Sequence, residues 1–214
     1  MKKNLKVKKL IFGWYLKNER NFPWRYTKEP YRIMIAEFML QRTKAEQVVP
    51  VYEKFTKKYP DIYSLSCAKN IDMIQVTKNL GLHWRSDHFI KAAKFIIENY
   101  SSVFPDKAEE LLKIPGIGEY VAGVILAVCF NKTYPIVDTN IARFINRFYG
   151  LRLEGEIRRK NEIIEIAEKI FSVKNIGKFL FAIIDFTSLI CKPINPRHEN
   201  CIIKDYCKYF NSDN

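Results

Sequence analysis

The sequence predicts an all-α protein, and three observations support this fold class. Apolar residues recur at three- and four-residue spacing along most of the chain, which is the periodicity of helices that bury one face. No alternating pattern of the kind that marks a half-buried strand runs for more than four residues. Hydrophobic residues make up 48% of the 214 residues, which is enough for a sizeable core.

Each expected helix is a run of periodic apolar positions that ends near a helix breaker. Prolines at positions 23, 30, 60, 105, 115 and 135 fall between the runs, as expected for residues that cannot continue a helix. Asp106 stands three residues before Glu109 and is expected to cap the sixth helix. In order along the chain, the expected helices are 8–18, 31–45, 46–58, 70–79, 87–99, 106–113, 119–130, 139–149, 157–172 and 175–191.

A short glycine-rich hairpin interrupts two of these helices. Pro115 ends the helix 106–113, and Gly116 and Gly118 allow backbone conformations and close approaches that other residues do not. A new helix then begins near Glu119, so its first backbone N–H groups are available to bind a phosphate. A hairpin of this kind also occurs as a purely structural connection, and the glycines alone do not decide between the two interpretations.

Two carboxylates lie in apolar surroundings. Asp138 follows Ile136 and Val137 and precedes the helix 139–149, so it is either a simple N-cap or a functional carboxylate that the helix N-terminus keeps ionised. Glu37 lies within "IMIAEFMLQ", where it either faces solvent or is buried. Burial would raise its pKa and mark it as a candidate for acid–base chemistry.

The charge balance indicates a polyanionic partner. Lys and Arg number 36 against 23 Asp and Glu, and the net charge of +13 suits phosphate neutralisation, although solubility alone could also explain it. No apolar run is long enough to span a membrane, and the basic N-terminus is not followed by a signal-peptide cleavage site. The protein is therefore expected to be intracellular, in the cytoplasm with the nucleoid, and to have no membrane partner.

The five cysteines do not suggest a disulfide framework. Cys191, Cys201 and Cys207 fall in the last 24 residues, and this clustering indicates a metal site. Cys67 and Cys129 lie in apolar sequence and are expected to be buried packing residues.

Four motifs in order resemble those of the base-excision DNA glycosylases of the endonuclease III superfamily, and the similarity covers nearly the whole chain. The segment "LLKIPGIGEYVAGVILAVCF…YPIVDTNIARFINRFYG" resembles the helix-hairpin-helix element and the aspartate that follows it. The segment "FPWRYTKEPYRIMIAEFMLQRT" (22–43) resembles the early motif of adenine glycosylases and of G·T mismatch thymine glycosylases. The segment "NLGLHWRSDHFIKAA" (79–93) resembles the part that fills the gap in flipped DNA, and "CKPINPRHENCIIKDYC" (191–207) resembles the iron–sulfur loop.

The resemblance implies two helical lobes with a DNA cleft between them. The expected lobes are 1–25 with 134–214, which carries the cluster loop 191–207, and 26–133, which carries the helix-hairpin-helix motif 106–130. The partner is then double-stranded DNA with a mismatched or damaged base, bound by a monomer. The implied catalytic residues are Asp138, Glu37 and Tyr120, and the implied DNA-binding residues are Gln41, Arg42, Leu82, His83, Gly116 and Gly118.

Tyr120 stands where bifunctional relatives have a lysine. A phenol cannot form the Schiff base that precedes strand cleavage, so the departure implies a monofunctional glycosylase. The expected substrate is thymine or uracil opposite guanine, because "VDTN" lacks the glycine that adenine glycosylases have in this motif and because the sequence ends soon after Cys207, without their C-terminal domain. An adenine glycosylase acting opposite 8-oxoguanine or guanine is the alternative within the class. A non-catalytic DNA-damage-binding module is the alternative outside it.

The cluster loop departs from the family at one ligand. The family spacing C-x6-C-x2-C-x5-C is kept, but the second position is His198, between Cys191 and the pair Cys201 and Cys207. Three thiolates and an imidazole can hold a [4Fe-4S] cluster, which is the expected cofactor. Zinc, for which Cys3His is a common structural ligand set, and the absence of any metal are the alternatives.

Overall fold

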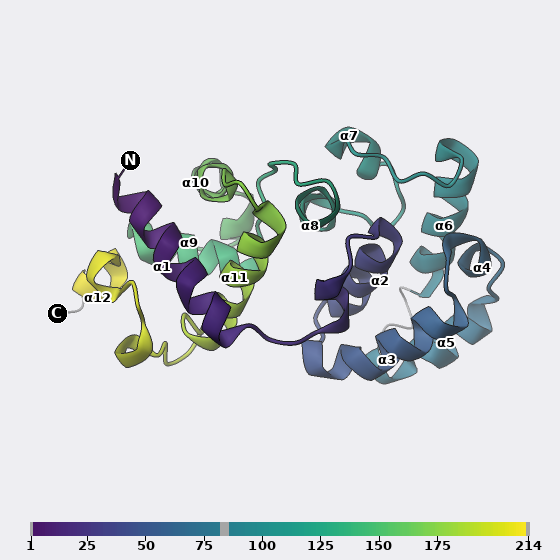
Figure 1. The fold of residues 1–214 in the computed structure, drawn as a ribbon, viewed down its shortest axis with the longest axis horizontal. Coiled ribbons are helices and arrows are strands. Elements are labelled where there is room, and N and C mark those ends of the chain that lie inside the picture. Colours follow the sequence, from purple (N-terminus) through teal and green to yellow (C-terminus); the bar gives the residue numbers. More distant parts are fainter. Residues whose placement is uncertain (1, 82–85, 213–214) are drawn as a thin grey trace. The chain divides into compact units, whose positions relative to one another are not determined.

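The computed structural model describes residues 2–81 and 86–212, and within these ranges all regular secondary structure is helical (Figure 1). The chain forms two compact units. Residues 1–20 and 131–214 form the discontinuous unit, and residues 21–130 form the central unit. The all-α prediction is confirmed. No helix in the described part of the chain is both long enough and apolar enough to cross a membrane.

The central unit is built around the helices α2 (Pro30–Leu40) and α8 (Glu119–Cys129), which are buried on nearly every side. Its elements are η1 (Pro23–Tyr26), α2 (Pro30–Leu40), α3 (Ala45–Lys58), α4 (Ile62–Ser66), α5 (Asn70–Thr77), η2 (Lys78–Leu80), α6 (Ser86–Tyr100), α7 (Ala108–Leu111) and α8 (Glu119–Cys129). Helix α2 begins at Pro30, where the fixed φ suits a first helical residue, and it packs against both α3 and α8. Phe89 of α6 contributes to this core, with its ring 5.3 Å from the rings of both Phe38 and Phe55.

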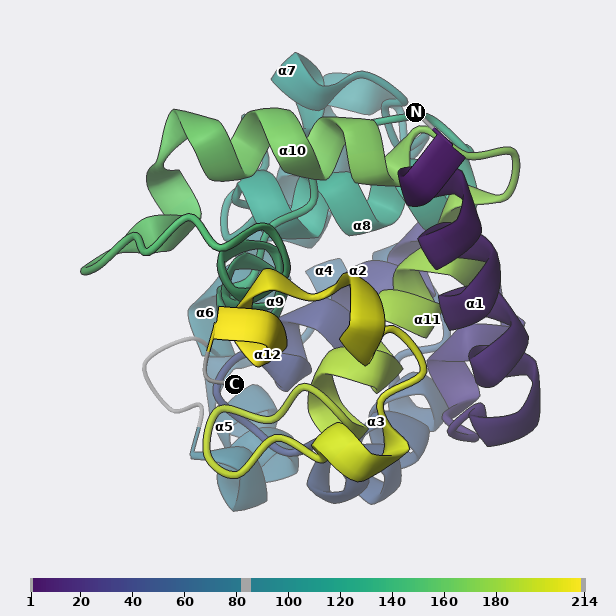
Figure 2. The same ribbon diagram turned by 90° about the vertical axis from the view of Figure 1, so that its left-hand side faces the viewer.

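The discontinuous unit is arranged around α9 and α11 (Figure 2). Its elements are α1 (Lys2–Asn18), α9 (Thr139–Tyr149), η4 (Ile157–Arg159), α10 (Asn161–Phe171), α11 (Ile176–Leu189), η5 (His198–Asn200), η6 (Lys204–Tyr206) and α12 (Lys208–Ser212). Helix α11 packs against α1, α9 and α10, and α12 packs against α9. Phe186 of α11 is 1% exposed and meets Phe144 of α9 edge to face, which places the core of the unit between these helices.

Both points where the chain leaves or re-enters the discontinuous unit are fixed on α11. Arg20, the last residue of the first segment, donates from Nε to Oδ1 of Asp185 at 2.6 Å, and Asp185 is completely buried. Asn131, the first residue of the second segment, donates to the Lys174 carbonyl and accepts from the Ile176 N–H, each at 3.1 Å. One helix therefore anchors both connections between the units.

Several element boundaries differ from those expected. The first helix begins at Lys2 rather than at residue 8, and the helix expected over 31–45 ends at Leu40, because the chain turns at Arg42 with φ of 61°. The helix expected over 157–172 is divided into η4 and α10. Helices α4 and α12 were not expected.

Two expectations about single residues were wrong. Asp106 is not the N-cap of α7, because the helix begins two residues later, at Ala108, and its N-cap residue is Lys107, whose side chain makes no capping hydrogen bond. Cys67 is exposed rather than buried, because it lies at the C-terminal end of the short helix α4, beyond the buried residues Ile62 and Leu65.

Candidate active site and metal centre

The hairpin between α7 and α8 uses its two glycines for different reasons. Gly116 has φ of +86°, and a Cβ there would lie 3.0 Å from Cζ of Phe38 and 3.1 Å from Cβ of His88, so both the conformation and the packing require glycine. Gly118 is extended and is the N-cap residue of α8, and a Cβ added there would have no atom within 4 Å. The Gly118 side of the hairpin is therefore open to the approach of another molecule.

The other expected site residues of the central unit lie on α2, on α8 or in the turn after α2. Glu37 is 6% exposed, so of its two interpretations burial is the correct one. Tyr120 is half-buried in the first turn of α8. Gln41 is the C-cap of α2, and Arg42 follows it as an exposed residue in the left-handed region. Leu82 and His83 lie outside the described residues.

Asp138, in the discontinuous unit, is held at both carboxylate oxygens. It is the N-cap residue of α9, and Oδ1 accepts from the backbone N–H of Ile141 at 2.7 Å. Oδ2 accepts from the Asn140 side-chain amide at 3.1 Å. Asp138 is half-buried, so it keeps access to solvent while these two donors fix the plane of its carboxylate. The N-cap interpretation is therefore correct, and it is compatible with a catalytic one.

A hydrogen-bonded chain leads from Asp138 to the cysteine loop. The Asn140 side chain that donates to Asp138 accepts from Nη1 of Arg143 at 3.0 Å. Arg143 also donates to the Cys191 carbonyl, at 2.9 Å from Nη2, and to the Thr187 carbonyl at 3.1 Å. Burial removes water from the Arg143 guanidinium and thereby lowers its pKa. The two carbonyl oxygens accept the hydrogen bonds that water would otherwise accept.

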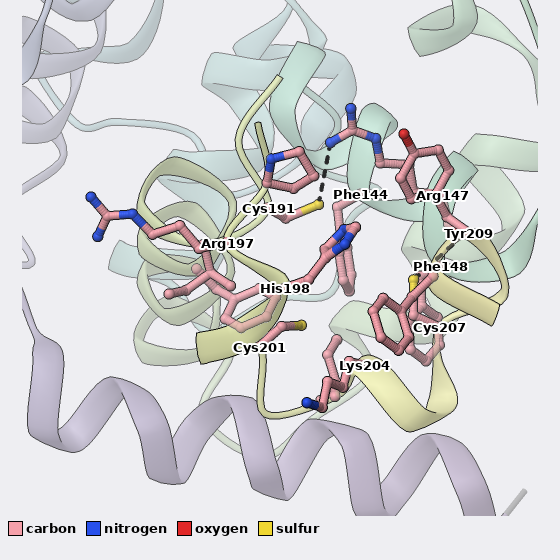
Figure 3. A pocket seen from close by; sticks show the side chains of 15 residues that line it. Phe144, Arg147, Phe148, Cys191, Arg197, His198, Cys201, Lys204, Cys207 and Tyr209 are labelled. Carbon is pink, nitrogen blue, oxygen red and sulfur yellow. Dashed lines mark hydrogen bonds between the residues drawn. The ribbon is translucent and has the colours of Figure 1, made fainter. Parts of the chain in front are cut away.

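The four expected cluster ligands line a single pocket between α9 and the C-terminal loop (Figure 3). Nη1 of Arg147 lies 3.9 Å from the Cys191 sulfur and donates to the Lys192 carbonyl at 2.6 Å. Burial raises the pKa of the Cys191 thiol, an effect that Arg147 opposes, and burial raises the pKa of Cys201 to about 11. The pocket wall is completed by apolar side chains that include Phe144, Phe148, Phe186, Ile190, Ile203 and Phe210.

The donor set and its arrangement fit an iron–sulfur cluster. Cys191, His198, Cys201 and Cys207 line the walls of the pocket, and in the described residues no three His, Cys, Asp or Glu side chains gather closely enough to hold a single metal ion. The ligands of a cluster bind different iron atoms and therefore surround it without converging on one point. The apolar wall and the guanidinium of Arg147 suit a group that carries buried thiolates.

Residues 35–172 match the sequence profile of the HhH-GPD superfamily of base excision DNA repair proteins. The chain belongs to this superfamily. Residues 191–207 match the iron–sulfur binding domain of endonuclease III, which confirms the expected family and indicates that the loop binds an iron–sulfur cluster. The profile match covers the helix-hairpin-helix element and Asp138, and the second match begins and ends at the outer two of the four expected ligands.

The relatives of this HhH-GPD chain include both adenine and thymine/uracil DNA glycosylases. The chain is 34% identical over 200 residues to an adenine DNA glycosylase of Buchnera aphidicola, a match that covers 92% of this chain and 57% of the relative. It is 30% identical to a thymine/uracil-DNA glycosylase of Methanothermobacter thermautotrophicus, which covers 94% of this chain and 91% of the relative. The solved structure of a thermostable thymine-DNA glycosylase matches with a TM-score of 0.89 at 29% identity and covers 99% of this chain and 98% of that chain.

The residues that sequence reasoning missed are those that support the expected site residues. Asn140 and Arg143 connect Asp138 to the cysteine loop, and Arg147 contacts Cys191. Their spacing was a usable signal, because Arg143 and Arg147 are four residues apart and therefore lie on one face of α9. Two buried or half-buried arginines on the helix that follows Asp138 could have been predicted to bind the loop that carries the cysteines.

Proposed function

We propose that this chain is a monofunctional DNA glycosylase that hydrolyses the N-glycosidic bond of a mismatched base, thymine or uracil opposite guanine. Its fixed, half-buried carboxylate at Asp138 carries the proposal, because both oxygens are held by donors from the start of α9. The likeness to the thymine-DNA glycosylase structure over almost the full length of both chains supports the choice of substrate. The protein acts as a monomer on double-stranded DNA.

The reaction begins with extrusion of the target base, because the glycosidic bond is hidden in the base stack. Gly116 and Gly118 present backbone N–H groups of the hairpin to a DNA phosphate, and Gln41 and Arg42 contact the duplex at the turn after α2. These contacts hold the DNA without requiring a particular sequence. The chain's net charge of +13 supplies the general attraction to the phosphate backbone.

Asp138 then stabilises the sugar as the bond to the base breaks. Positive charge develops on the sugar ring, and a carboxylate whose position is already fixed stabilises it without reorganisation. The same carboxylate orients or deprotonates the attacking water, and the proton of that water ends on a carboxylate or on the departing base. Glu37, buried in α2, contacts the edge of the base or a water beside it.

Tyr120 and the cluster loop complete the proposed assignment. Tyr120 has no amine, so the reaction stops at an abasic site and the DNA strand stays intact. When bound, the cluster ties the four ligands of the loop together, since metal binding stabilises the segment that carries the ligands. The loop in turn supplies the Cys191 carbonyl that holds Arg143, and through it Asn140 and Asp138.

Adenine glycosylase activity is the second candidate. The 34% identity to the adenine DNA glycosylase of Buchnera aphidicola favours it, and a buried glutamate suits protonation of a departing purine. The chain spans 57% of the length of that relative. The two candidates differ in the base released and in the base opposite it.

Single-turnover base release from a panel of duplexes tests the proposal. T, U and A are each placed opposite G and opposite 8-oxoguanine, and abasic product is measured after alkali and, separately, without it. We expect release of T and U opposite G, with strand cleavage only after alkali. In Asp138→Asn, release should fall by about a hundredfold or more while duplex binding is kept. Release of A alone would favour the second candidate, and binding with no release of any base would leave a non-catalytic module.

A further inference from the structure

The C-terminal helix α12 covers the pocket that the four expected ligands line. Tyr209 and Phe210 both belong to α12 and both contribute to the pocket wall. Figure 3 labels Tyr209 beside Arg147. The ring of His198 meets the ring of Phe210 edge to face, with centroids 5.1 Å apart and an interplanar angle of 82°. It also meets the ring of Tyr209 at 6.1 Å and 68°. The imidazole therefore lies against two aromatic rings from one short helix.

This helix is itself held firmly against the unit. The Arg147 guanidinium, which also lies beside the Cys191 sulfur, stacks over the Tyr209 ring at 4.9 Å, and the Lys204 ammonium lies 5.9 Å from the Phe210 ring. Gly150, at the end of α9, has φ of +63°, and a Cβ there would lie 2.9 Å from Cβ of Lys208. The close packing of α12 on α9 therefore leaves the two rings little freedom to move.

A histidine ligand needs its ring plane to be oriented, whereas a cysteine ligand does not. An imidazole binds through one ring nitrogen, so the plane of the ring must be oriented, and metal-binding histidines usually obtain this from a hydrogen bond at the other nitrogen. Among the described residues the His198 ring has no hydrogen-bond partner, and its ring contacts are with Tyr209 and Phe210. These aromatic contacts are therefore the candidates for orienting the plane of the imidazole.

We propose that α12 is a positioning element that orients His198 as the fourth ligand of the iron–sulfur cluster, with Phe210 and Tyr209 fixing the imidazole plane. The inference rests on the cluster that the loop match indicates, and it does not depend on which base the enzyme releases. It explains how a loop with the spacing of four cysteines accommodates a histidine at the second position. A thiolate at that position has no ring plane to set and would not need α12.

A double-variant experiment separates positioning from simple covering of the pocket. Phe210→Ala is made in the wild-type chain and in a His198→Cys chain, and the control is Tyr206→Ala, which removes an aromatic ring of the cluster loop that is not part of the pocket wall. Iron and acid-labile sulfide per chain, with the absorbance near 400 nm, are measured on full-length protein before and after a fixed exposure to chelator. Far-UV circular dichroism checks that each variant is folded.

We expect Phe210→Ala to lose cluster at least fivefold faster than wild type, and the His198→Cys, Phe210→Ala chain to lose it no faster than His198→Cys alone. Pulsed electron paramagnetic resonance of the reduced wild type should show coupling to a histidine nitrogen that is absent in His198→Cys. Equal loss in both backgrounds would mean that Phe210 only covers the pocket, and unchanged retention in Phe210→Ala would mean that it has no role; either result overturns the proposal. Zinc or no metal in the wild type would overturn it at the cluster itself, while base release, measured separately, would decide the glycosylase assignment.

Discussion

Replacing Gly116 by alanine tests whether the hairpin conformation is set by packing inside the central unit. The left-handed conformation at φ of +86° costs a residue with a Cβ about 1–2 kcal/mol. The new Cβ would also press against His88 at 3.1 Å and Phe38 at 3.0 Å, and overpacking of this kind costs about 1–3 kcal/mol. His88 cannot give way at its Cβ without moving α6. The lower entropy of the unfolded alanine chain returns about 0.4–1 kcal/mol.

The net destabilisation of Gly116→Ala is about 3 kcal/mol, which lowers the Tm of a chain of this length by roughly 6–12 °C. Two other glycines separate the cost of the backbone conformation from the cost of overpacking. Gly155 also has a positive φ, of +75°, but a Cβ added there would have nothing within 4 Å, so Gly155→Ala carries the strain alone and should cost about 1 kcal/mol. Gly118 has neither strain nor contact, so Gly118→Ala should change the Tm by about 2 °C or less.

The measurement is thermal unfolding followed by circular dichroism at one scan rate for all three variants. The expected order of Tm loss is Gly116→Ala, then Gly155→Ala, then Gly118→Ala. A Tm for Gly116→Ala equal to that of Gly155→Ala would show that the contacts with His88 and Phe38 relax freely, and the packing argument would be refuted. A Gly118→Ala chain that keeps its Tm but binds DNA less tightly would assign the open glycine to the substrate.

Three further outcomes are expected. Asp185→Asn should destabilise the protein by about 2–3 kcal/mol, less than the roughly 3–5 kcal/mol typical of fully buried pairs, because the Arg20 side chain is 22% exposed. Urea unfolding checks this, with the exposed-pair variant Glu156→Gln as a control that should leave stability nearly unchanged. Iodoacetamide at pH 8 should label the exposed Cys67 and spare Cys129, because burial raises the pKa of Cys129 to about 12 and only about one of its thiols in 10⁴ is ionised. The labelling of Cys129 should rise about tenfold per pH unit, and equal labelling of the two cysteines in peptide mass spectra would contradict this. Duplex binding, followed by fluorescence anisotropy, should weaken at least tenfold between about 50 and 200 mM salt, and a flat response would count against phosphate contacts.

Local signals in the sequence were sufficient to predict the longer helices, although not all of their ends, and the position of Asp138. The aspartate precedes a helix with a strongly one-sided apolar pattern, and the structure places it as the N-cap residue of that helix. Glu37 is buried, as its apolar neighbours indicated. Both results depend mainly on residues close in sequence, which is where pattern reasoning is strongest.

The features that were missed depend on contacts between distant segments. The chain turns at Arg42 with a positive φ, although the apolar pattern would continue the helix. The positions of Arg143 and Arg147 are set by carbonyls more than 40 residues away in sequence. Helix α12 has only five residues and is stabilised by packing on α9, with Tyr209 held by Arg147, so its own sequence contains little that predicts it.

Because α11 anchors both connections between the units, the discontinuous unit cannot be completed until α11 has been synthesised on the ribosome. Arg20 and its partner Asp185 are 165 residues apart, so at about 5–20 residues per second α1 is made roughly 8–33 s before the helix that it packs against. The central unit, whose residues 21–130 are contiguous, can fold completely during this interval. Helix α1 must wait with its apolar face uncovered, and during translation that face is a natural target for a chaperone. The central unit therefore folds first, although the discontinuous unit is the first whose synthesis begins.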